Sequence, residues 1–252
     1  MKQNPFKAAL RANRAQIGCW VGTATPYLTE IYASVGFDWL ALDGEHGPND
    51  LRTILGQLQA MAAYDTAAVV RPPDGSATML KQLLDVGAQN LLVPMVNTAE
   101  QAEALAAAVR YPPQGMRGVG SALARASQWK QVPDYFERAN DEVCLLVQAE
   151  SVMAMDHLEA IAAVDGVDGV FFGPADLAAS MGHILDPGNP AVKRAVEDGI
   201  KLVLSRGKAA GILTTDPAFA RRCIELGAQF VAVGVDTLLI VNSAKALLNQ
   251  YR

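Results

Sequence analysis

The sequence has only three cysteines, and they stand far apart. Cys19, Cys144 and Cys223 form neither a close pair nor the spacing of a zinc site. A scattered, odd set of cysteines is typical of a reduced protein, so we expect buried thiols and a cytoplasmic location. The sequence also lacks an apolar run of about 18 residues, which argues against a membrane span, and its first residues lack the apolar stretch of a secretory signal.

Positive charge is scarce as well. The 252 residues include 21 lysines and arginines against 26 aspartates and glutamates, which gives a net charge of −5. No basic patch or stripe is visible, and this argues against a nucleic-acid partner. In contrast, 51% of the residues are hydrophobic, enough to bury one large core. We therefore expect residues 1–252 to form a single domain.

The sequence is rich in short apolar segments that alternate with helical ones. The predicted strands span residues 17–21, 38–43, 67–71, 90–96, 142–150, 169–173, 209–213 and 230–234. The predicted helices span residues 25–36, 51–64, 77–87, 99–111, 133–141, 151–164, 191–207, 217–227 and 237–250. Glycine repeatedly closes a helix before the next strand, as helix C-termini prefer. Strands that are apolar throughout are typical of a parallel sheet covered on both faces.

Eight strand–helix units predict the α/β class and, within it, a (β/α)8 TIM barrel, because closure of the sheet removes both edges. An open, doubly wound sheet is the alternative fold. Such a sheet would carry a glycine fingerprint after its first strand, but IGCWVGTAT lacks the GxGxxG spacing. We therefore favour the barrel, in which catalytic groups project from the carboxyl ends of the strands.

Polar side chains stand at the carboxyl ends of the predicted strands. They are Asp43, Glu45 and His46 after the second strand, Arg71 at the end of the third, Gln148 and Glu150 at the end of the fifth, Asp176 after the sixth, and Thr214 beside Leu213 at the end of the seventh. Because these ends meet at one mouth of a barrel, the pattern indicates an enzyme.

Glu150 and Asp176 follow neighbouring strands, and two facing carboxylates repel unless a cation or a proton lies between them. Two oxygen ligands with other positions open suit Mg²⁺ or Mn²⁺. Alternatively, both carboxylates only stabilise helix N-termini. His46 can act as a general base if a partner holds its ring. Asp43 and Asp85 are candidate partners, and an exposed loop histidine is the other interpretation.

Arg71 ends an apolar strand before two prolines, where it can bind a carboxylate in bidentate fashion. A surface ion pair with Asp74 is the alternative. The segment GMRGVGSALARAS contains Arg117 and Arg125 and is unusually long for a barrel loop. It can bind an anion, cover the mouth or contact a neighbouring subunit, and its spacing does not choose among these.

Four motifs, "LDGEHGPND", "RGVGSALARAS", "VQAES" and "GVFFGPADLAASMG", together resemble the HpcH/HpaI aldolase family. They stand in the family's order, and the resemblance spans almost the whole chain. It implies a (β/α)8 barrel of the phosphoenolpyruvate/pyruvate type. It also implies a homo-hexamer built as a dimer of trimers, with the last helix exchanged between subunits.

The resemblance also implies roles for individual residues. Glu150 and Asp176 match the ligands of a divalent metal, Mg²⁺, Mn²⁺ or Co²⁺. The positions that match pyruvate binding are Gln148, Gly173, Ala175 and Asp176, where the turn offers backbone N–H groups to a carboxylate. His46 matches the general base, and Asp85 matches the residue that raises its basicity. Arg71 matches the group that stabilises the transition state and contacts the substrate.

We therefore predict a metal-dependent aldolase that reversibly cleaves a 4-hydroxy-2-oxo acid to pyruvate and a small aldehyde, in the catabolism of aromatic or sugar acids. A Schiff-base lysine is the competing chemistry, but the strand ends contain no lysine. An acyl-CoA lyase of a related barrel family and a non-catalytic metabolite-binding barrel are the alternative functions. The residues that we expect to shape the aldehyde site are Leu213, Val119, Ser121, Leu123 and residues of a neighbouring subunit.

Overall fold

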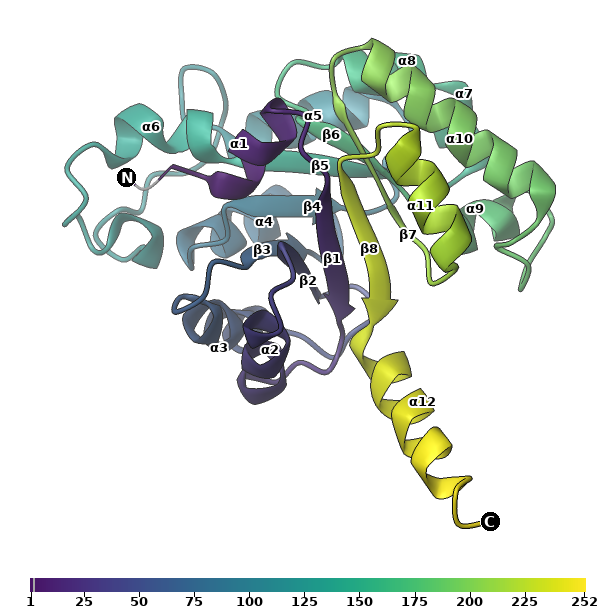
Figure 1. The fold of residues 1–252 in the computed structure, drawn as a ribbon. Helices are drawn as coiled ribbons and strands as arrows, with labels where there is room; N and C mark the ends of the chain where they lie inside the picture. Colours follow the sequence, from purple (N-terminus) through teal and green to yellow (C-terminus); the bar gives the residue numbers. More distant parts are fainter. Residues whose placement is uncertain (2) are drawn as a thin grey trace.

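Eight parallel strands close into a barrel in the computed structural model, which describes residue 1 and residues 3–252. The strands are β1 (Gln16–Val21), β2 (Trp39–Asp43), β3 (Ala67–Arg71), β4 (Asn90–Val93), β5 (Cys144–Ala149), β6 (Gly169–Phe172), β7 (Ala209–Leu213) and β8 (Phe230–Val235). Each strand pairs with the next, and β8 pairs with β1 (Figure 1). The predicted (β/α)8 fold is confirmed, and the doubly wound alternative is wrong.

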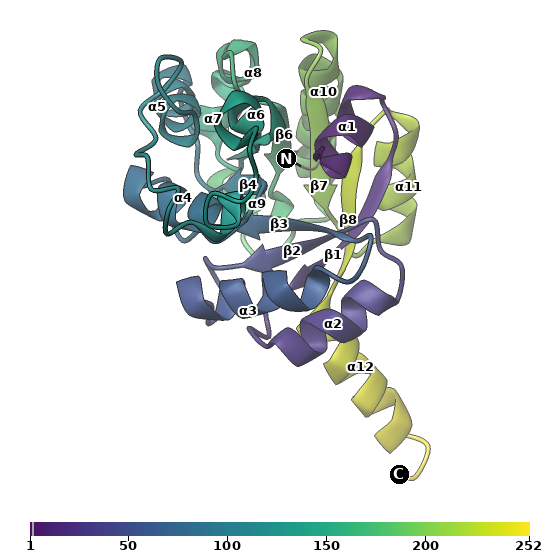
Figure 2. The same ribbon diagram turned by 90° about the vertical axis from the view of Figure 1, so that its left-hand side faces the viewer.

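Helices cover the outside of the barrel (Figure 2). They are α2 (Pro26–Ser34), α3 (Leu51–Met61), α4 (Ala77–Asp85), α5 (Ala99–Val109), α6 (Tyr135–Glu142), α7 (Val152–Asp156), α8 (Leu158–Ala163), α9 (Pro174–Ser180), α10 (Pro190–Ser205) and α11 (Pro217–Glu225), with a short 3₁₀ helix at Arg125–Ser127. Reciprocal side-chain and backbone hydrogen bonds at Asp50 and Thr98 begin α3 and α5. The predicted helix 151–164 is divided at His157 into α7 and α8.

A helix that was not predicted, α1 (Pro5–Arg11), closes the amino-terminal end of the barrel. Its Phe6 is fully buried and packs against the rings of Trp39 and Phe230. These rings leave no room for other side chains, because a Cβ at Gly18 would lie 2.2 Å from Trp39 and one at Gly211 would lie 2.3 Å from Phe230. The barrel interior is therefore a packed core, and an internal site is possible only toward the opposite end.

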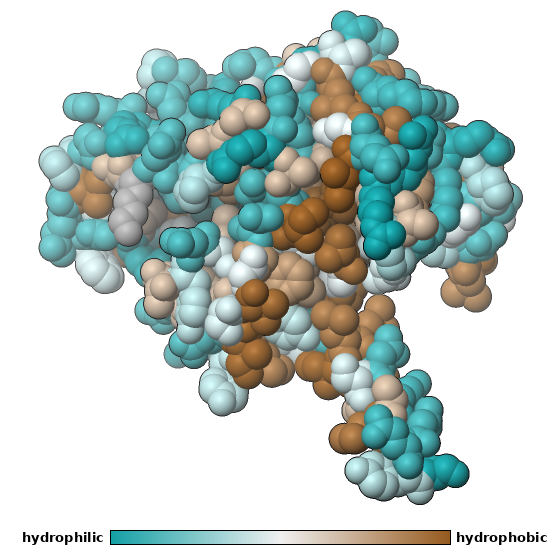
Figure 3. All heavy atoms as spheres, in the orientation of Figure 1, coloured by the Kyte–Doolittle hydropathy of each residue, from teal (hydrophilic) through white to brown (hydrophobic). Residues whose placement is uncertain are grey.

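The last helix, α12 (Asp236–Leu248), projects away from the barrel (Figures 1 and 2). Asp236 anchors its first turn by accepting hydrogen bonds from Gly22 and Thr23. Every residue from 237 onward is exposed, and apolar side chains lie on the helix surface where it leaves the barrel (Figure 3). Within residue 1 and residues 3–252, no helix combines the length and the apolarity needed to cross a membrane.

Candidate active site

The carboxyl ends of β2, β3 and β5 bring charged side chains together at one mouth of the barrel. The register pairs Asp43 with Arg71, the last residues of β2 and β3. Arg71 is buried and donates from Nε to Asp43 Oδ1 at 2.9 Å and from Nη2 to Oδ2 at 2.7 Å. Its Nη1 lies 2.6 Å from Glu45 Oε2. Arg71 therefore turns into the mouth, and the alternative of a surface ion pair with Asp74 is wrong.

Glu150 lies one residue beyond β5 and is 3% exposed. Its carboxylate accepts the N–H of Met95 and the side-chain amide of Gln148, both at 2.8 Å. Gly173, the residue after β6, permits this position, because a Cβ there would lie only 2.4 Å from Glu150 Oε2. The end of β5 and the turn after β6 are thus packed together around one carboxylate.

The surroundings of Glu150 disfavour the ionised form of its carboxyl group. Burial is the main cause that raises the pKa of Glu150 to about 7. The nearby carboxylates of Asp176 and Glu45 contribute in the same direction, while the Met95 N–H and Arg71 act against them. Burial likewise raises the pKa of Glu45 above its ordinary value, although the positive charge of Arg71 acts against it. Carboxylates crowded in this way are stabilised in their ionised form by a cation.

The donor atoms present fit a divalent metal ion with open coordination positions. Glu150 and Asp176 supply carboxylate oxygens, and Gln148 Oε1 is a buried oxygen that has no hydrogen-bond partner among the described residues. Hard oxygen donors of this kind suit Mg²⁺ or Mn²⁺. Within residue 1 and residues 3–252, no group of three or more His, Cys, Asp or Glu side chains could by itself hold a metal. Such an ion would therefore need water or substrate as further ligands.

The predicted pyruvate-binding positions Gly173, Ala175 and Asp176 form the turn into α9, and Asp176 lies in its first helical turn. Pro174 has no N–H group, so Ala175 and Asp176 carry the free backbone donors of this turn. Leu213 ends β7 at the same mouth and is half-buried. These residues lie at the same end of the barrel as Glu150, and their role in pyruvate binding stays a prediction.

His46 and Asp85 are not brought together within one chain. The side chain of His46 is 69% exposed, and its Nε2 lies 3.9 Å from Glu45 Oε2. Asp85 is the last residue of α4, which runs about 13 Å back from the mouth toward the amino-terminal ends of the strands. There Asp85 binds Arg117 Nη2 at 2.7 Å. The predicted pairing of His46 with Asp85 stays a prediction, and a single chain does not provide it.

The long loop after α5 packs against the end of α4, away from the mouth of its own barrel. Arg117 is buried between Asp85 and the hydroxyl of Tyr135, and Arg125 donates to the carbonyl of Val86 at 3.0 Å. Both arginines therefore hold the loop in place. Val119 and Leu123 lie in this loop and are 69% and 88% exposed. The alternative that the loop covers the mouth of its own chain is wrong.

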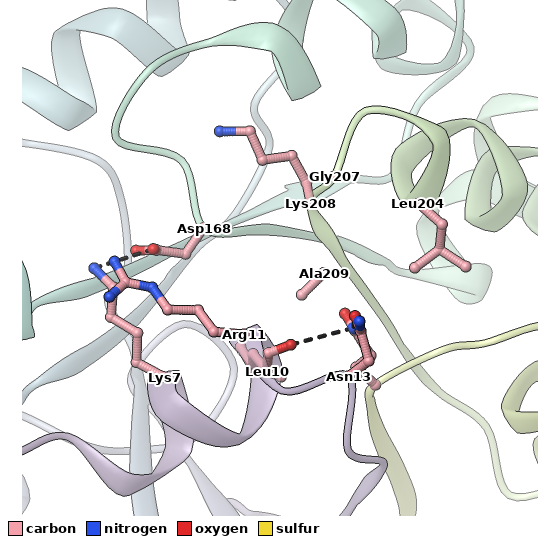
Figure 4. Close-up of a pocket in the computed structure, with 10 residues that line it drawn as sticks. Lys7, Leu10, Arg11, Asn13, Asp168, Leu204, Gly207, Lys208 and Ala209 are labelled. Carbon is pink, nitrogen blue, oxygen red and sulfur yellow. Dashed lines mark hydrogen bonds and ion pairs between the residues drawn. The ribbon is translucent and has the colours of Figure 1, made fainter.

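A cavity of about 340 Å³ lies at the other end of the barrel, beneath α1 (Figure 4). Lys7, Asp168 and Lys208 are among its lining residues. Lys7 pairs with Asp168 at 3.0 Å, and the ammonium of Lys208 donates to the carbonyls of Val164 and Val167. These charges stabilise local structure, and the cavity contains none of the predicted site residues.

Comparison with known proteins gives consistent matches along the chain. Residues 16–243 match the family described as HpcH/HpaI aldolase/citrate lyase. A hydroxypyruvate/pyruvate aldolase of Cupriavidus necator is 60% identical over 99% of this chain and 93% of its own length. A 4-hydroxy-2-oxo-heptane-1,7-dioate aldolase of Salmonella arizonae is 55% identical over 99% and 95%. A crystal structure of a family protein from Burkholderia cenocepacia J2315 is 36% identical, covers 99% of this chain and 100% of its own, and has a TM-score of 0.95.

The raised pKa of Glu150 predicts a pH-dependent stability of the metal-free protein. Because this pKa is about 7 instead of 4.5, the folded protein binds more protons than the unfolded chain between these values. The free energy of unfolding therefore falls as pH rises through this window and is level above it. Urea unfolding of chelator-treated protein between about pH 5 and pH 8 measures this slope.

The Glu150→Gln variant is the control, since it has no proton to exchange at this position. We expect its slope to be shallower than that of the wild type, and the difference between the two curves isolates Glu150 from other titrating groups. Parallel curves would show that Glu150 ionises normally in the metal-free mouth.

Proposed function

The chain belongs to the HpcH/HpaI aldolase/citrate lyase family, and from this premise we propose that it is a divalent-metal-dependent pyruvate aldolase. The reaction is that of a carbon–carbon lyase, the reversible cleavage of a 4-hydroxy-2-oxo acid to pyruvate and an aldehyde. The observation that carries the proposal is the position of buried Glu150 beside Asp176 and Arg71 at the carboxyl end of the barrel.

Glu150 and Asp176 would hold the metal, with Mg²⁺, Mn²⁺ and Co²⁺ as candidates. When bound, such an ion supplies a Lewis acid that stabilises the enolate left by cleavage of the C3–C4 bond. The substrate carboxylate lies against the N–H groups of Ala175 and Asp176, with Gln148 and Gly173 beside it. The side-chain amide of Gln148 also keeps the Glu150 carboxylate in place.

Arg71 stabilises the charge that develops on the substrate oxygens. Its Nε and Nη2 each use one N–H on Asp43, and its Nη1 has one toward Glu45. A guanidinium has five N–H groups, so one on Nη1 and one on Nη2 stay available to the substrate. The imidazole of His46, which is open to the mouth, removes the proton of the C4 hydroxyl.

We also propose that the functional form is a homo-hexamer, a dimer of trimers in which α12 is exchanged. The support is the apolar, exposed surface of α12 and the distance of Asp85 from the mouth of its own chain. Asp85, Val119 and Leu123 lie on one outer face, from which a neighbouring chain can receive them. There Asp85 would orient His46, and the apolar side chains, with Ser121 and Leu213, would line the aldehyde site.

The acyl-CoA lyase alternative has lost its main support, since Arg117 and Arg125 are both used to hold their own loop. A non-catalytic barrel would have no need of a buried arginine and crowded carboxylates at the mouth. We further propose a cytoplasmic location, for which three free, buried cysteines are the expected pattern.

The proposed chemistry is tested by assaying pyruvate release from a panel of 4-hydroxy-2-oxo acids, with hydroxypyruvate and pyruvate as donors in the reverse direction. We expect chelator to abolish turnover and Mn²⁺, Co²⁺ or Mg²⁺ to restore it, because Glu150 and Asp176 leave coordination positions for the substrate. Full activity in metal-free protein, or inactivation by borohydride in the presence of pyruvate, would instead indicate a Schiff base.

His46→Ala should lower aldol cleavage by about 10²–10⁴-fold, because cleavage needs a base at the C4 hydroxyl. Exchange of the pyruvate methyl protons should fall less, since Arg71 remains to stabilise the enolate. Deuterium loss from labelled pyruvate and aldol turnover are measured in the same preparation. Equal losses in both rates would assign enolisation to His46 as well, and unchanged rates would leave it as an exposed loop histidine.

The placement of Asp85 predicts that active sites are shared between chains. Asp85→Asn should lower turnover more than pyruvate affinity, because Asp85 acts on His46 and not on the substrate. Co-expression of differently tagged Asp85→Asn and His46→Ala chains should recover activity, since one mouth then combines His46 of one chain with Asp85 of its neighbour. Mixed assemblies that are no more active than either parent would refute an exchange of Asp85 between chains.

A further inference from the structure

We propose that Asp43 is the positioning residue of the mouth, which orients both Arg71 and the loop that carries His46. The inference rests on the proposed aldolase function for the role of Arg71. The sequence pattern suggested Asp43 only as a partner for the His46 ring. In the structure its carboxylate instead binds the guanidinium of Arg71 and the backbone N–H groups of Glu45 and His46.

The Asp43 carboxylate accepts five hydrogen bonds. Oδ1 accepts from Arg71 Nε at 2.9 Å, Glu45 N at 3.0 Å and His46 N at 3.3 Å. Oδ2 accepts from Arg71 Nη2 at 2.7 Å and from Trp20 Nε1 at 3.2 Å. A carboxylate has acceptors only, so it satisfies all five donors at once. An amide in its place would turn an NH₂ group toward at least one of these donors.

This arrangement fixes the direction of the guanidinium plane. The two bonds from Nε and Nη2 to one carboxylate are the bidentate geometry, which constrains orientation as well as distance. The Trp20 ring, 4.9 Å from the central carbon of the guanidinium, supports one of its faces. Arg71 therefore cannot rotate without breaking both bonds, and its free N–H groups stay directed away from Asp43.

Asp43 is well suited to remain ionised in this buried place. Burial alone would raise its pKa, but the hydrogen bonds and the charge of Arg71 outweigh burial and leave the pKa below its ordinary value. Glu45 differs, because its Oε2 has no hydrogen bond of good geometry among the described residues although Arg71 Nη1 is close. Asp43 is thus the fixed counter-ion of Arg71, and Glu45 is the looser one.

The same carboxylate shapes the loop after β2. By accepting two consecutive backbone N–H groups, Asp43 Oδ1 turns the chain at Glu45 and His46. Its own carbonyl accepts the side-chain amide of Asn49, which closes the turn. A Cβ at Gly47 would lie 2.5 Å from this carbonyl, so the turn is compact. Arg71 and His46 consequently take their positions from one residue.

The test is a double-mutant cycle between Asp43→Asn and Arg71→Lys, with kcat and KM measured for aldol cleavage. Asp43→Asn alone should lower kcat by about 10²-fold and change KM less, because a misplaced Arg71 affects the transition state most. A lysine at position 71 cannot form the bidentate pair. In that background, Asp43→Asn should have a smaller effect on kcat, because only its part through the loop of His46 remains.

A purely structural role for Asp43 would lower kcat by the same factor in both backgrounds, and this result would overturn the proposal. Affinity for oxalate, a planar dianion that resembles the pyruvate enolate, is measured by calorimetry in the same metal-loaded variants. The affinity for oxalate should be weaker in Asp43→Asn than in the wild type. In the Arg71→Lys background, adding Asp43→Asn should change this affinity little. Unchanged oxalate affinity in the single variant would also contradict the proposal.

Asp38→Asn is the matched control. Asp38 lies just before β2, and its Oδ2 accepts the N–H of Ile17 at 2.7 Å, so the change removes a comparable contact at the far end of the same strand. We expect its kcat and oxalate affinity to equal those of the wild type. If Asp43→Asn does not fold, Trp20→Phe removes one donor from Asp43 Oδ2 and keeps a ring under Arg71. Its kcat should then fall modestly, and an unchanged kcat would count against the proposal.

Discussion

Crowding of negative charge at one end of a rigid barrel is the constraint on which the rest of the site depends. Asp43, Glu45 and Glu150 converge there with Asp176, and among the residues that the structure describes Arg71 is the one guanidinium paired with this group. One arginine cannot compensate four carboxylates, and burial removes the screening that water would give. Negative charge is therefore in excess at the mouth of the barrel. A divalent cation at this mouth would both relieve the repulsion and supply the Lewis acid of the proposed reaction.

The packing of the barrel keeps these charges from moving apart. The register between β2 and β3 sets Asp43 opposite Arg71, and a glycine at position 173 allows the ends of β5 and β6 to meet at Glu150. Toward the other end, Phe6 and the aromatic side chains of the interior pack together as the core of the barrel. The packed core consequently opposes the repulsion between the carboxylates at the mouth. They stay close together because the surrounding strands fix their positions.

Whether a feature of the fold or the site could be predicted from the sequence depends on how far apart in the chain its interacting residues lie. The barrel and the strand-end residues Arg71 and Glu150 could be predicted, because apolar strands interrupted by polar residues form a local pattern. The bond between Asp43 and Arg71 could not, since it depends on the register of two strands 28 residues apart. Helix α1, which closes the amino-terminal end of the barrel, was not predicted. Its seven residues are too few for a helical repeat of apolar residues to be distinguished from a loop.

The position of Asp85 relative to His46 could not be predicted from one chain, because on our proposal it depends on the assembly of several chains. The groups that would act on the enolate, Glu150, Asp176 and Arg71, all lie within one chain. Of the groups that would tune the base and line the aldehyde site, Val119 and Leu123 are exposed, and Asp85 is half-buried against Arg117. On the proposed assembly, the pyruvate half of the reaction is set by the barrel and the aldehyde half by the interface. Changes in the outer loop can then alter the aldehyde that is accepted without disturbing the charges that stabilise the enolate.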